Sequence, residues 1–154
     1  MKNQRETLVN ANLSSRNKLE RILIDLDLNY NKIEITIDDF FYIVKLDSLF
    51  NELDQLYVLL SPSENNKELL VLCPNVYVLK KGDSKLSVLT ALNKANLKLA
   101  GGTVTLDDDG IVMYRRIERF DRTDSITKIK LLNIFNDIIA SIIYTAKEIK
   151  EIRK

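Results

Sequence analysis

The sequence contains no histidine and no tryptophan, and it has a single cysteine, Cys73. Without histidine there can be no Ser-His-Asp triad, no Cys-His pair and no histidine-ligated zinc or haem. A single cysteine excludes an internal disulfide and a cysteine-rich metal site. We therefore expect no catalytic residues, no metal ligands and no cofactor.

Strong net charge and long apolar runs are also absent. The chain has 23 basic and 22 acidic residues, which gives a net charge of +1 and no overall basic excess of the kind that nucleic-acid-binding domains show. No window reaches the ~18 apolar residues of a membrane span, and the first residues lack the apolar core of a signal peptide. We expect a cytoplasmic protein that binds neither nucleic acid nor membranes.

The 154 residues, 45% of them hydrophobic, suit one domain with a substantial core. We predict a frayed N-terminal segment at residues 1–13 and a single domain at residues 14–154.

Three segments have the apolar spacing of amphipathic helices. Their expected N-caps are Ser14 or Ser15 for the first, Asp83 or Ser84 for the second, and Asp124 or Ser125 for the third. The second is expected to end near Asn96 to Leu99, with Gly101-Gly102 as the stop. Its expected buried face consists of Leu86, Val88, Leu89, Ala91, Leu92 and Ala95. The third runs nearly to the C-terminus, and its apolar stripe is wide enough to lie across a sheet.

The remaining segments are typical of strands. Ile33, Ile35 and Ile37 alternate with polar residues, which predicts a half-buried strand that continues after a turn or bulge at Asp38-Asp39. The continuation spans residues 40–46, and the other expected strands span residues 55–60, 68–73 (interrupted at Pro74 and resumed at 76–79), 103–106 and 111–120. Asp107 to Gly110 predicts a tight hairpin turn. The order α-β-β-β-α-β-β-α predicts an α+β fold, with an antiparallel sheet and helices packed on one face.

The region from Leu86 to Arg116 resembles the YbjN-domain family, which has the type III secretion chaperone-like fold. The matching features are a leucine-rich helix ending in asparagines, Gly101-Gly102, a short strand, Asp108-Asp109-Gly110, and the strand Val112-Met113-Tyr114-Arg115. The element order extends the similarity over about residues 15–150. The resemblance implies a small, often dimeric domain that binds proteins, and it brings no catalytic residues.

Arg115, Arg119 and Arg122 are the candidate binding residues for a partner or an anion. On a strand, Arg115 and Arg119 share one face with Ile117, while Arg116 lies on the other face. Guanidinium groups suit carboxylates and phosphates, so the pair could hold an acidic partner. The alternative, which we favour, is a solvated strand edge that discourages aggregation.

Other motifs have structural explanations. Three adjacent aspartates, Asp107 to Asp109, lack the alternating ligands of a calcium loop and suit a turn. Residues 80–84 lack the spaced glycines of a phosphate loop. Cys73 is expected to be a core thiol. The six tyrosines are scattered over separate elements and do not form the aromatic-basic cluster of an RNA-binding sheet.

The function predicted from the sequence is a non-enzymatic protein-interaction or chaperone-like domain that forms a homodimer and binds a protein or peptide partner. The alternative is a small-ligand-responsive regulatory domain with a pocket between sheet and helix. An enzyme that uses carboxylates alone is a third possibility, although no convergent pair can be named from the sequence.

Overall fold

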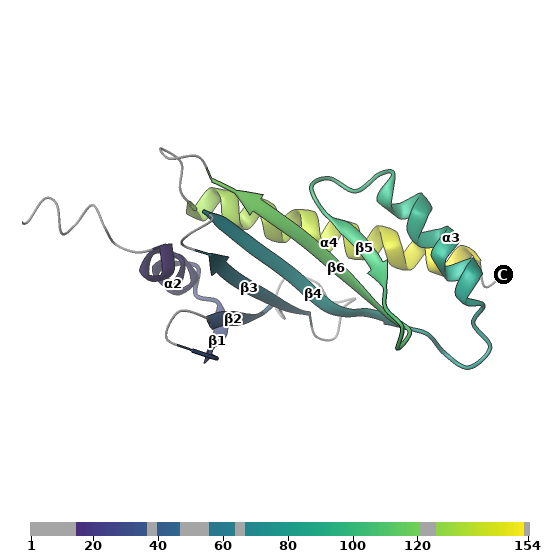
Figure 1. The fold of residues 1–154 in the computed structure, drawn as a ribbon. Coiled ribbons are helices and arrows are strands. Elements are labelled where there is room, and N and C mark those ends of the chain that lie inside the picture. Colours follow the sequence, from purple (N-terminus) through teal and green to yellow (C-terminus); the bar gives the residue numbers. More distant parts are fainter. Residues whose placement is uncertain (1–14, 37–39, 47–55, 64–66, 121–125, 153–154) are drawn as a thin grey trace, which may run out of the picture.

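In the described residues of the computed structural model, six strands form one antiparallel sheet, and three helices pack on one of its faces (Figure 1). The structure describes residues 15–36, 40–46, 56–63, 67–120 and 126–152. The elements are α2 (Ser15–Asp25), β1 (Asn29–Glu34), β2 (Phe40–Lys45), β3 (Tyr57–Ser63), β4 (Glu68–Val78), α3 (Lys85–Asn96), β5 (Thr103–Leu106), β6 (Ile111–Arg119) and α4 (Lys128–Glu151). The predicted α+β fold class is confirmed.

The strand order across the sheet is β1-β2-β3-β4-β6-β5, with β1 and β5 at its two edges. Each neighbouring pair is antiparallel. The chain leaves the sheet after β4, passes through α3 and returns as the β5-β6 hairpin. β6 thus lies between β4 and the short strand β5.

The two faces of the sheet differ in burial. Alternate residues of the strands face the helices and are fully buried, among them Tyr42, Val44, Val58, Leu60, Val71, Val112 and Tyr114. They form one core with α2, α3 and α4. By length and composition α4 could cross a membrane. Its buried residues, including Leu131, Phe135 and Ile138, belong instead to the core shared with the sheet.

The prediction for the first strand is wrong in its start and its face. β1 begins at Asn29, and the side chains of Ile33 and Ile35 are 40% and 69% exposed. Pairing with β2 sets Tyr30 opposite Val44, so Tyr30 faces inward and its ring packs edge-on against Tyr42. Ile33 lies on the uncovered side of this edge strand, and Ile35 lies just beyond the strand's end. Ile37 and Asp38-Asp39 lie outside the described residues.

Two helix predictions also need correction. On α3, Ser84 is the N-cap as expected, but Leu86 and Leu89 are exposed, the former by 75%. The N-cap of α4 is Thr127, whose hydroxyl accepts a hydrogen bond from the Lys130 amide at 3.2 Å, and not Asp124 or Ser125. Thr127 can act this way because its backbone is extended while the next residues are helical.

Neither proline ends its strand. β3 continues through Pro62, which lies opposite Leu69, and β4 continues past Pro74. The register of β4 against β6 shifts between Cys73 and Tyr77, and Asn75 adopts a φ of 58° there. An irregularity of this kind accommodates the missing N–H of Pro74, because the residues around it do not need to pair in step.

Candidate functional site

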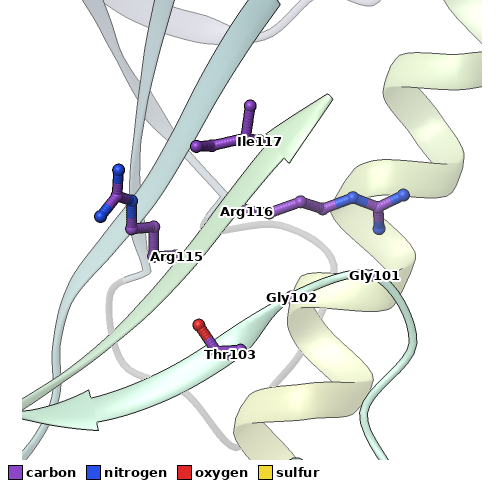
Figure 2. Close-up of a pocket in the computed structure, with 6 residues that line it drawn as sticks. All are labelled: Gly101, Gly102, Thr103, Arg115, Arg116 and Ile117. Carbon is purple, nitrogen blue, oxygen red and sulfur yellow. The ribbon is translucent and has the colours of Figure 1, made fainter. Parts of the chain in front are cut away.

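The arginines singled out in the sequence lie on β6. Arg115, Ile117 and Arg119 are exposed and occupy the face of the sheet opposite the helices. Figure 2 shows the Arg115 and Arg116 side chains pointing in opposite directions, with Arg116 directed toward α4. Arg122 lies outside the described residues. The structure therefore brings Arg115 and Arg119 to one face, as their spacing predicted.

These two arginines differ in their contacts. The Nε atom of Arg119 donates a hydrogen bond to Oε1 of Glu68 on β4 at 2.8 Å, although the arginine side chain remains 80% exposed. Within the part of the chain that the structure describes, no carboxylate lies within ion-pair distance of Arg115. Arg115 is therefore available to an external carboxylate or phosphate.

Arg116 lies on the helix side of the sheet, where two carboxylates of this chain contact it. Its Nη1 donates to Oδ2 of Asp137 on α4 at 2.6 Å, and its guanidinium also contacts Glu118. Burial disfavours the charged guanidinium, but the hydrogen bonds to Asp137 and Glu118 outweigh it and raise the pKa of Arg116. This arginine ties β6 to α4, and both its carboxylate partners come from this chain.

Two glycines let the chain pass close to the side chains of Tyr114 and Arg116. A Cβ atom on Gly102 would lie 2.2 Å from the Tyr114 hydroxyl, and one on Gly101 would lie 2.8 Å from Cζ of Arg116. Gly101 also has a φ of 78°, which favours glycine. The segment before β5 is thus held against Tyr114 and Arg116, on the helix side of β6.

Tyr114 is fully buried, and its hydroxyl has no hydrogen-bond partner among the described residues. Burial raises the pKa of Tyr114, and the neighbouring Arg116 guanidinium offsets part of that rise. Tyr114 is thus a neutral residue packed in the core.

An open groove of about 530 Å³ lies beside β6 at the start of β5, where Thr103 pairs with Arg115. Its walls are Gly101, Gly102, Thr103, Arg115, Arg116 and Ile117 (Figure 2). A smaller depression of about 240 Å³ lies between Lys98 and α4, where it is lined by Asp137, Ser141 and Tyr144. The larger groove combines backbone, an apolar side chain and the exposed Arg115, and it is our candidate site.

Next to the groove, the face of the sheet opposite the helices is largely apolar. Its apolar residues include Phe41, Ile43, Leu59, Leu70, Leu72, Met113 and Ile117, which are half-buried or exposed. Charged residues such as Glu68, Arg115 and Arg119 lie on the same face toward β6. Cross-strand pairs make this surface continuous, since Ile43 lies opposite Leu59 and Leu59 opposite Leu72. No helix among the described residues covers it. We call it the open face.

The remaining candidates have structural roles. The side chain of Asp107 accepts a hydrogen bond from the Ile111 amide at 2.7 Å, and Gly110 has a φ of 81°, so the acidic run forms the predicted turn. Asp83 accepts hydrogen bonds from the Lys80 amide and the Tyr77 hydroxyl, which closes the 80–84 loop on itself.

Cys73 is fully buried in β4, and burial raises its pKa to about 12, so it is an unreactive core thiol. The structure's described ranges hold no group of three or more Asp, Glu or Cys side chains that could bind a metal.

Sequence reasoning missed the cluster of Arg116, Asp137, Tyr114 and the two glycines. The available signal is the pair Gly101-Gly102, which the sequence offers as a helix stop and as part of the family resemblance. Asp137 gives no such signal, because its partner Arg116 is 21 residues away and spacing does not reveal the contact.

The fold and site define a class: an α+β domain with an antiparallel sheet, helices on one face, and an open groove at the strand edge. No family model matches the chain, and no curated protein matches its sequence. The fold is similar to that in the crystal structure of an uncharacterized protein from Methanothermobacter thermautotrophicus, with a TM-score of 0.62 and 13% sequence identity. The similarity covers 89% of this chain and 97% of the archaeal one. At this identity it establishes the shared fold.

Proposed function

We propose that this chain is a non-enzymatic protein-interaction domain that works as a homodimer, with the open face as the contact surface between copies. The observation that supports this proposal is the continuous apolar surface on the open face. Exposed apolar patches of this kind, rimmed by polar residues, are typical of protein-protein contacts.

The chemistry of the site favours binding over catalysis. Arg116 is engaged by Asp137 and Glu118, Tyr114 is enclosed, and Cys73 has a high pKa. The alternative of a ligand pocket between sheet and helix rested on Arg115 and Arg119. Both side chains lie on the face of the sheet opposite the helices, so this pair does not support a pocket on the helix side.

The dimer is tested by measuring mass with light scattering over a range of concentrations. We expect twice the 17.8 kDa of one chain, and we expect Leu59→Glu to shift the protein to the monomer. A glutamate at the centre of the open face would bury an unpaired charge on association, so dimerisation should weaken by about 100-fold or more.

Leu97→Glu is the matched control, because Leu97 is an apolar residue that is already 86% exposed just after α3. It should leave the mass unchanged. Circular dichroism confirms that both variants fold. A wild-type mass of one chain at every concentration, or equal effects of the two substitutions, would refute the proposed dimer.

A further inference from the structure

We propose that the outer edge of β6, from Arg116 to Arg119, binds an extended acidic segment of a partner protein as an added strand. This inference rests on the proposed function as a protein-interaction domain, and it names the chemistry of a partner other than a second copy. We call residues 116–119 the β6 edge.

The first observation is that β6 extends beyond β5. β5 pairs with Val112 to Arg115 and stops there, whereas β4 pairs with β6 as far as Arg119. From Arg116 onward, β6 has a described strand on one side only. Unpaired strand edges are templates for strand addition.

The direction of the free backbone groups follows from the hydrogen bonds at each end of β6. The Phe120 amide donates to the Lys67 carbonyl at 2.9 Å on the β4 side, and the Ile111 carbonyl accepts from the Asp107 amide at 3.0 Å on the β5 side. Backbone groups alternate sides along a strand. The N–H and C=O groups of Ile117 and Arg119 therefore point away from β4, to the side that β5 leaves open.

A second observation is the groove at the same place. It is lined by Ile117 of the β6 edge and by Arg115, Gly101 and Gly102 beside it. The chain before β5 does not continue along β6, because Gly102 is packed against Tyr114 and Gly101 against Arg116. In Figure 2 these glycines lie beside α4, and the groove of about 530 Å³ lies between them and the residues of β6.

Charge indicates which chain fits. Arg115 and Arg119 flank Ile117 on the open side of the sheet, and Arg115 has no carboxylate partner among the described residues. An added strand with acidic residues at alternate positions would place carboxylates beside these guanidinium groups. The exposed Ile117 between them would contact an apolar side chain.

A second copy of this chain fits the edge poorly. Antiparallel self-pairing centred on Ile117 places Arg115 opposite the second copy's Arg119. Centring on Glu118 or on Arg119 places two copies of that residue opposite each other. Each arrangement sets like charges across the two strands, which is destabilising. Centring on Ile117 also sets Arg116 opposite Glu118, but these two side chains already pair with each other within one chain. The observations therefore favour an acidic segment of a different protein.

The test is fluorescence anisotropy with a labelled peptide of about eight alternating Glu and Val residues, matched by a peptide of alternating Lys and Val. We expect the acidic peptide to bind at least about tenfold more tightly, with affinity falling as salt rises. Arg115→Glu should weaken it about tenfold, whereas Lys81→Glu, at an exposed loop lysine, should change it less than about twofold. No binding of the acidic peptide, or equal binding of both peptides, overturns the inference.

Backbone pairing is tested by Ile117→Pro. Proline removes the N–H that faces the open side, and it is tolerated at strand edges, so the β4 ladder should persist while peptide affinity falls at least about tenfold. Unchanged affinity in the folded variant would contradict strand addition.

Hydrogen exchange tests backbone pairing in the wild-type protein, without the Ile117→Pro variant. The amides of Ile117 and Arg119 should gain protection when peptide binds, and absence of that gain also refutes the proposal. Protection that rises with protein concentration alone would mean that a second copy fills the edge, which overturns the inferred partner. The mass of the wild-type protein tests the dimer separately, so the two failures are distinguishable.

Discussion

At the scale of single residues, close packing around Tyr114 and Gly102 decides how the chain approaches β6. The tyrosine hydroxyl is buried without a partner among the described residues, and the glycine leaves no room for a side chain. Burying an unpaired hydroxyl is unfavourable, so this contact is held by the surrounding core and not by a hydrogen bond of its own.

We expect Gly102→Ala to lower the free energy of unfolding by about 1 to 3 kcal/mol, because the new methyl group overlaps the Tyr114 ring. Tyr114→Phe should cost little or be stabilising, since the hydroxyl it removes has no partner in the described structure. The double variant should recover part of the loss, because Tyr114 Oη is one of the overlapping atoms. Urea unfolding of the four proteins checks this. Additive effects of the two substitutions would contradict the contact.

Cys73 predicts a dependence of stability on alkaline pH. Its folded pKa of about 12 lies above the ordinary 9.0, so the thiol ionises first in the unfolded chain. The unfolded state then binds fewer protons, and stability falls as pH rises from about 9 toward 12. Between pH 8 and 10.5 the wild type should lose about 1 to 2 kcal/mol more than Cys73→Ala. Denaturant unfolding at both pH values measures the difference, and parallel losses in the two proteins would refute it.

At the scale of elements, local sequence signals predicted where most helices, strands and turns lie, and strand pairing determined which face of a strand is buried. The turn at Asp107 to Gly110 and the cap at Ser84 follow from side-chain chemistry within a few residues. The inward face of β1 does not follow from such local chemistry. Its register with β2 decides that Tyr30 is inside and Ile33 outside, and no pattern within β1 contains that information.

The start of α4 offers a direct comparison of two candidate caps. Thr127→Ala should lower the free energy of unfolding by about 1 kcal/mol, because it removes the hydroxyl that accepts from the Lys130 amide. Ser125→Ala should have a smaller effect, since Ser125 is not the N-cap. Thermal unfolding of both variants measures the difference. A larger loss of stability from Ser125→Ala would contradict Thr127 as the N-cap and favour the N-cap predicted from the sequence.

At the scale of the whole molecule, helices cover one side of the sheet, and the described helices leave the other open. Residues 1–60 carry a net charge of −3 and residues 111–154 a net charge of +4, so the near-zero total is a sum of opposite regions. The fold places β1 and β2 toward one edge of the sheet and β6 toward the other. The basic residues of β6 thus lie beside the groove and the free strand edge.

The candidate site was predictable only in part. The shared face of Arg115 and Arg119 followed from the period of a strand. The ion pair between Arg116 and Asp137 joins residues that are distant in sequence. The pairing of β6 with β5 stops at Arg115 because β5 is shorter than β6, so it depends on the relative lengths of the paired strands.

The absence of histidine and the single cysteine, known from the sequence alone, excluded whole classes of chemistry, and apolar spacing determined the α+β class. Composition and period are properties of the chain, so they can be read without a fold. Only the tertiary structure decided which side of each strand is covered, where β6 loses its neighbour, and which arginine is already paired. Those features arise when distant segments pack together, and they are what turn a strand with arginines into a candidate binding edge.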